Sequence, residues 1–127
     1  MTTLESLLLS AAQNALEVED LLLFAERHEI TAIGASEAIS LHVAQSYADG
    51  RIDYVIGDRI MNSMIGLVTE KAFWAVSGNV VPPLVLSVYQ AFDEGEYIHP
   101  GDPPDVDAES KYTKAMIAAI LGEQRAA

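Results

Sequence analysis

The fold class is indicated first by residues 3–28, which read TLESLLLSAAQNALEVEDLLLFAERH. Apolar residues recur here at alternating steps of four and three, the spacing that lines one face of a helix. This stripe consists of Leu4, Leu8, Ala11, Ala15, Val18, Leu22 and Ala25. A second apolar stripe runs beside it, so the apolar arc is wide. The stretch predicts one long helix, buried on more than one side, either at the centre of a bundle or at a dimer interface.

Further helical patterns follow along the chain, separated by glycine, proline and polar clusters. Pro82 and Pro83 suit the first turn of a helix, where a missing backbone N–H costs nothing. Gly57 and Gly66 lie inside a helical pattern and indicate close helix crossings, with Gly66 also a candidate kink. No stretch alternates with period two for long, so no strand is predicted. The predicted helices cover residues 3–28, 36–48, 52–76, 83–94 and about 105–122.

The sequence therefore predicts an all-α fold, a compact bundle of about five helices of which one or two are broken. A length of 127 residues and an apolar fraction of 50% suit one packed domain. We assign that domain to residues 1–122 and a short tail to residues 123–127.

The excess of acidic over basic residues limits the classes of molecule that the chain is expected to bind. The chain holds 7 basic and 19 acidic residues, a net charge of −12. This argues against free nucleic acid and anionic membranes, because both are bound through basic surfaces. The absence of cysteine excludes disulfides, thiolate chemistry and cysteine-ligated zinc. No secretory signal and no apolar run of roughly 20 residues is present, which predicts a cytoplasmic location.

Motifs of enzymes are mostly lacking. The chain contains no Gly-x-Ser-x-Gly pentad, no phosphate loop and no dinucleotide fingerprint. Glu96 and His99 have the Glu-x-x-His spacing of di-iron bundles, but they lie in a proline-rich loop where helical spacing has no meaning. His28 is predicted at a helix C-terminus, His42 on a helix surface or hydrogen-bonded in the core, and Trp74 as structural. We predict no cofactor, no metal and no catalytic residue.

The unusual feature is an acidic segment, residues 93–109, which reads DEGEYIHPGDPPDVDAE. It contributes −7 to the net charge and contains no lysine or arginine, and its prolines restrict the backbone. Clustered carboxylates steer a basic protein electrostatically, and a tyrosine in a stiff loop is a low-entropy anchor. The candidate binding residues are Asp93, Glu94, Glu96, Tyr97, His99, Asp102, Asp105, Asp107 and Glu109.

Other interpretations of this segment stay open. It could be a solvated connection whose acids cap the last helix and pair with Lys111 or Lys114. It could hold calcium or magnesium through its carboxylates, although the spacing of a calcium-binding loop is missing. A hydrolase with Glu94 or Glu96 as acid and Asp102 as base would need a dry cleft, which the sequence does not indicate.

In length, charge, helix content and lack of cysteine, the chain resembles bacterial immunity proteins, which bind and block basic toxin nucleases. No motif carries this resemblance. It implies a non-catalytic inhibitor whose acidic segment meets a basic protein partner. One alternative is a ligand-binding or metal-carboxylate enzyme with a site between helices, using Tyr89, His42 or the carboxylates near Glu94. Another is a homo-oligomeric assembly subunit in which the first helix forms a homodimer.

Overall fold

The computed structural model describes residues 3–126, and every regular element in that range is helical. The all-α prediction is confirmed. Over these residues there are seven α-helices where about five were predicted, and one π-helical turn that continues directly into the last helix. The elements are α1 (Leu4–Ala12), α2 (Val18–Arg27), α3 (Ala32–Ala48), α4 (Tyr54–Val68), α5 (Lys71–Ser77), α6 (Pro83–Asp93), η1 (Glu109–Thr113) and α7 (Lys114–Ala126).

The predicted first helix is two helices. The chain leaves α1 through Asn14, whose φ of 56° lies in the left-handed region that asparagine tolerates better than most residues. A new start follows at Glu17, whose backbone N–H donates to the carboxylate of Asp20 over 3.1 Å. A local hydrogen bond of this kind begins a new helix, while the spacing of the apolar residues continues across the break.

The predicted helix over 52–76 is also two helices, α4 and α5. At the break, the hydroxyl of Thr69 donates to the carbonyls of Ile65 and Gly66, each over 2.9 Å. Two helix ends differ as well. Helix α3 begins four residues before the predicted start at residue 36, because Thr31 accepts from the backbone N–H of Gly34. Helix α7 runs to Ala126, where a tail was predicted from residue 123.

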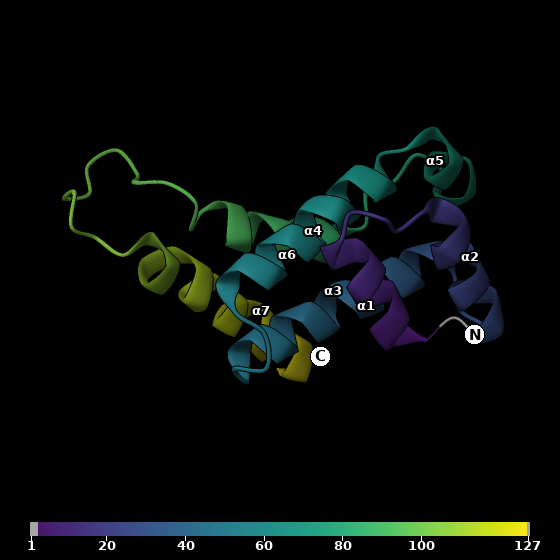
Figure 1. Cartoon of the computed structure of the whole chain (residues 1–127), viewed down its shortest axis with the longest axis horizontal. Coiled ribbons are helices and arrows are strands. Elements are labelled where there is room, and N and C mark those ends of the chain that lie inside the picture. The colour runs from purple at the N-terminus through teal and green to yellow at the C-terminus, as the bar shows by residue number, and fades with distance from the viewer. Residues whose placement is uncertain (1–2, 127) are drawn as a thin grey trace.

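The central helix is α3, which packs against α2, α4, α5, α6 and α7 (Figure 1). The prediction of a central first helix is wrong, since α1 packs mainly on α4. The alternative, that this helix forms a dimer interface, stays a prediction. The prediction for the two prolines is confirmed, because Pro83 occupies the first turn of α6. The next N–H, that of Leu84, donates to a carboxylate oxygen of Glu37 on α3 over 3.0 Å.

The chain between α6 and η1 leaves the bundle as a long projecting loop (Figure 1). We refer to residues 94–108 as the acidic arm. It lies within the acidic segment singled out from the sequence, and α6 and η1, which form its two ends, pack against each other. Within residues 3–126 no helix has the length and apolar character needed to cross a membrane.

Candidate functional site

The base of the acidic arm is fastened where Gly95 meets Thr113 of η1. Thr113 is fully buried, and its hydroxyl donates to the carbonyl of Ala91 over 2.7 Å. A Cβ placed on Gly95 would lie 2.2 Å from Oγ1 of Thr113, so a side chain at residue 95 would force the two ends apart. The arm therefore departs from a fixed base.

An aromatic stack runs through the arm. The ring of Tyr97 stacks on His99 at 4.3 Å between centroids, and His99 stacks on Tyr112 of η1 at 3.8 Å. Nε2 of His99 lies 2.7 Å from the carbonyl oxygen of Glu94 and 3.0 Å from its Oε2. Both oxygens accept, so Nε2 is the donor. The stack joins the arm to the bundle through η1.

Asp102 adds a second internal attachment. Its carboxylate accepts from the hydroxyl of Tyr112 and pairs with Nζ of Lys111. These hydrogen bonds lower the pKa of Asp102 and raise the pKa of both partners. The local pairing expected for Lys111 is thus present. Within the described residues Lys114 makes no ion pair.

The outer face of the arm is both apolar and acidic. Tyr97 is 47% exposed and Ile98 is 55% exposed, and the carboxylates of Glu96 and Asp105 also face solvent. In residues 93–109, and among the ion pairs of the described chain, Asp102 is the only carboxylate that pairs with a lysine. The other four carboxylates of the arm, those of Glu94, Glu96, Asp105 and Asp107, are therefore not paired with a lysine of the described residues.

Three carboxylates meet where the arm leaves α6. Glu96 lies close to Asp93 at the end of α6 and to Asp58 on α4. Partial burial, together with these two neighbours, raises the pKa of Glu96 to about 7. Burial also raises the pKa of Asp58. The cluster therefore takes up a proton as the pH falls through about 7, and Glu96 is an exposed residue.

Asp107 and Glu109, the last two acidic residues of the segment, lie at the start of η1. Asp107 accepts from the backbone N–H of Glu109 over 3.1 Å and from the hydroxyl of Ser110 over 2.8 Å, and these bonds lower its pKa. Its predicted capping role is confirmed. In η1 the N–H of Lys114 bonds to the carbonyl of Glu109, five residues back.

Over residues 3–126 no three histidine, aspartate or glutamate side chains gather in a way that would hold a metal ion.

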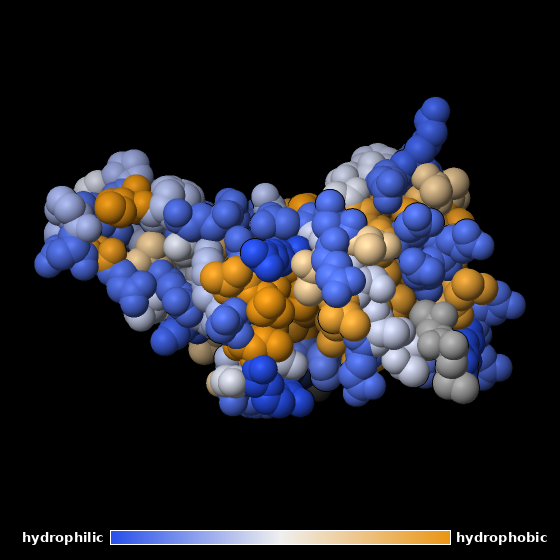
Figure 2. Space-filling model, viewed as in Figure 1, coloured by the Kyte–Doolittle hydropathy of each residue, from blue (hydrophilic) through white to orange (hydrophobic). Residues whose placement is uncertain are grey.

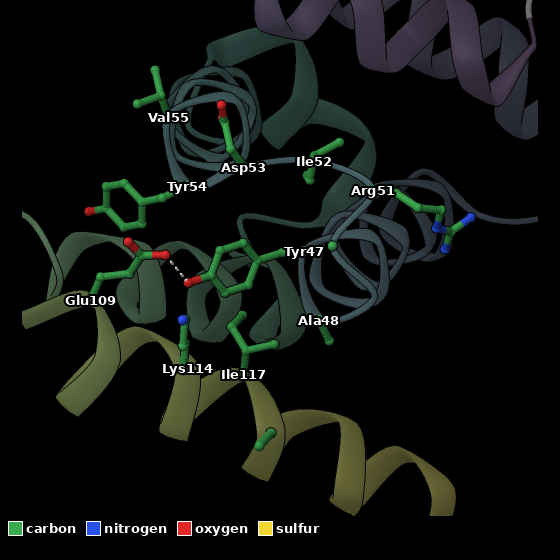
Figure 3. Close-up of a pocket in the computed structure, with 12 residues that line it drawn as sticks. Tyr47, Ala48, Arg51, Ile52, Asp53, Tyr54, Val55, Glu109, Lys114 and Ile117 are labelled. Atoms are coloured by element: carbon green, nitrogen blue, oxygen red, sulfur yellow. Dashed lines mark hydrogen bonds between the residues drawn. The ribbon is translucent and has the colours of Figure 1, made fainter.

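Glu109 points into a pocket that sequence reasoning missed (Figure 3). The pocket is open to solvent, has a volume of about 810 Å³ and lies between the end of α3, the start of α4 and the η1–α7 helix. The hydroxyl of Tyr47 donates to Glu109, and that of Tyr54 donates to the carbonyl of Phe92 over 2.6 Å. Burial, with the neighbouring Glu109, raises the pKa of Tyr47, so its phenol stays a donor.

The residues of the rival enzyme interpretation do not share this pocket. His42 lines an apolar groove of about 300 Å³ formed by α1, α3 and α4, which Tyr89 and Glu94 do not line. Phe73 is fully buried and Trp74 is half-buried, so one of the two packs inward as predicted. His28 caps the C-terminus of α2, also as predicted.

No family model, curated protein or solved structure matches the chain. The chemistry of its own residues is therefore what supports a function.

Proposed function

We propose that this chain is a non-catalytic binding protein that recognises a basic protein through the acidic arm. The observation that carries the proposal is the internal construction of the arm. Its stack and Asp102 hold it to the bundle, while Tyr97 and Ile98 stay exposed beside carboxylates that no lysine neutralises.

These features suit recognition on physical grounds. Pooled negative charge attracts a cationic surface and raises the rate of encounter. A loop that is already ordered loses less conformational entropy on binding than a flexible one. Tyr97 and Ile98 supply apolar contact area at the centre of the acidic surface, as an interface anchor does.

The finer proposal follows from the resemblance in length, charge and helix content to immunity proteins. In this form the partner is a basic enzyme, such as a nuclease, that the chain inhibits by covering a cationic surface. The proposal includes the cytoplasmic location predicted from the sequence.

The test is capture of partners from the source cells on immobilised protein at low salt and pH 8, where Glu96 is largely ionised. The test variant is Glu96→Gln with Asp105→Asn, two exposed positions of the arm. The matched control, Glu19→Gln with Glu26→Gln, removes the same charge from the exposed face of α2.

We expect the wild type and the control to retain a basic protein that salt elutes, and the arm variant to lose it. Tyr97→Ala should weaken capture without changing the charge. The proposal fails if the captured protein is acidic, if salt does not release it, or if both double variants retain it equally.

A second candidate function, a self-associating assembly subunit, is favoured by the apolar groove between α1, α3 and α4. Apolar surface gathers there in Figure 2, and Leu9, which lines the groove, is 61% exposed. Patches of this kind mark contact sites. Light scattering of the wild type and of Leu9→Lys tests it, since a dimer should revert to a monomer in the variant. A wild type that stays monomeric at high concentration excludes it.

A further inference from the structure

The pocket beside Tyr47 contains a carboxylate without a cationic partner. Glu109 is half-buried and accepts the hydroxyl of Tyr47, yet no basic group of the described chain lies within 4.0 Å of its oxygens. Arg51 is turned away and donates to Asp49 over 3.2 Å (Figure 3). A partly desolvated anion of this kind gains free energy from any cation that reaches it.

The walls of the pocket suit a cation attached to an apolar stem. Tyr47 points toward Glu109 and donates its hydroxyl to the carboxylate, and Figure 3 shows the ring of Tyr54 beside the same carboxylate. Faces of tyrosine rings attract ammonium and guanidinium groups. Ile52, which is half-buried, provides apolar surface in the same pocket.

Lys114 is a competing cation at the rim of the pocket. It is exposed, and in Figure 3 its amine is directed toward the hydroxyl of Tyr47. Asp53, which caps the start of α4, adds a second carboxylate to the pocket wall. With a net charge of −12 on the chain, the surrounding potential favours a cationic ligand over an anionic one.

We propose that this pocket binds an alkylammonium or guanidinium group, with the cation at Glu109 and its apolar stem against the tyrosine rings. A volume of about 810 Å³ has room for a lysine or arginine side chain together with the backbone beside it. The inference deepens the proposed function and rests on it for one of two sources, a side chain of the basic partner. The other source is a free organic amine.

The test uses the full chain labelled with ¹⁵N and titrated with n-butylammonium and n-butylguanidinium chloride. Butanol and sodium butyrate at matched ionic strength are the uncharged and anionic controls. We expect saturable shifts of backbone amides around Tyr47, Tyr54 and Glu109 with the two cations only. Equal shifts with butanol, or none that saturate, would overturn the inference.

Two pocket variants and one control test whether Glu109 and Lys114 determine the affinity for the cations. Glu109→Gln should weaken cation binding by about tenfold or more, the usual consequence of losing a charge-assisted contact. Lys114→Met, at an exposed position, should tighten binding because the competing charge is gone. Glu26→Gln on α2 should leave the affinity unchanged. Unaltered binding in both pocket variants contradicts the assignment even where the probes bind.

A blocked glycine-lysine-glycine peptide separates the two sources. Binding tighter than that of butylammonium assigns the pocket to a protein side chain, and weaker binding assigns it to a free amine. The outcome is independent of the arm. If the probes bind but charge removal in the arm does not affect protein capture, the proposed function fails and the pocket stands. If capture behaves as expected and the probes do not bind, only the pocket assignment fails.

Discussion

Gly57 of α4 lies directly against the ring of Phe92 of α6. A Cβ added to Gly57 would lie 2.5 Å from both Cε1 and Cζ of that ring, closer than real Cβ contacts come. The ring is fully buried and packs against Tyr47 and Tyr54, with centroids 5.1 and 5.7 Å away. It has no free space into which to retreat, so the crossing of α4 and α6 depends on glycine at this position.

Gly57→Ala is therefore expected to lower the free energy of unfolding by about 1–3 kcal/mol, the usual cost of overpacking a core. Urea denaturation followed through Trp74, the single tryptophan, measures the change.

Gly66→Ala is the matched control in the same helix. Nothing lies within 4 Å of a Cβ at residue 66. Because alanine favours helix over glycine, this variant should be more stable than the wild type by about 0.5–1 kcal/mol. Equal destabilisation at both positions would show that loss of glycine flexibility, and not the contact with Phe92, is responsible.

These two glycines illustrate how far the sequence alone predicts the fold. Apolar spacing identifies every stretch as helical, because the period of 3.6 residues is a property of the backbone. Position in a helix cannot tell Gly57 from Gly66, since only the partner helix distinguishes them. The sequence predicts that one or two helices are broken, but it does not place the breaks at Asn14 and Thr69, for a related reason. Polar side chains stop those helices locally while the apolar stripe continues.

For the candidate site, the sequence predicts the loop, its charge and the capping role of Asp107, all of which are local properties. It does not predict the contacts that give the arm its form. The hydrogen bond from Tyr47 to Glu109 joins residues 62 positions apart. The stack of His99 on Tyr112 joins residues on the two sides of the proline-rich part of the arm. Such pairs follow from how α3, α6 and η1 pack, which no spacing rule contains.

Glu37 is expected to stabilise the start of α6 from outside that helix. Its carboxylate accepts from the N–H of Leu84, in a first turn that carries no cap of its own. Glu37→Ala should cost about 1 kcal/mol in urea denaturation, as loss of a helix cap does. Glu37→Gln keeps an acceptor and should retain most of the stability. A loss as large in the glutamine variant would assign the effect to charge instead of the hydrogen bond.

The cluster of Glu96, Asp93 and Asp58 predicts that the free energy of unfolding depends on pH. The pKa of Glu96 is raised from 4.5 to about 7 in the folded chain. Between these values the folded state binds more protons than the unfolded state, so the free energy of unfolding falls as pH rises. The stability contributed by protonated Glu96 is fully present below pH 4.5 and lost as pH passes 7.

Urea denaturation from pH 5 to pH 8 should show this decline, and Glu96→Gln should flatten it. That range avoids the acid window below 3.8 in which the lowered pKa of Asp102 acts with the opposite sign. Glu19→Gln, at an exposed position of α2, should keep the slope of the wild type. An unchanged slope in Glu96→Gln would contradict the assignment to this residue.

Asp102 is expected to determine how ordered the acidic arm is. Removing its carboxylate frees Lys111 and the hydroxyl of Tyr112. Asp102→Ala should speed hydrogen exchange of the arm amides several-fold while the amides of α3 and α4 keep their protection. Asp105→Ala removes an exposed carboxylate from the same loop and should have no such effect. Identical exchange in both variants would mean that the stack alone holds the arm.

The π-helical turn η1 determines how the residues at the base of the arm are rotated about the helix axis relative to α7. Thr113, Ile117 and Leu121 are the buried residues of η1 and α7, one per turn along one side. Each residue of an α-helix adds a rotation of about 100°. Deleting one residue within Glu109–Thr113 would restore a regular helix and swing Glu109 by about that angle, away from Tyr47. The length of this short stretch thus decides the direction in which a whole acidic surface is presented.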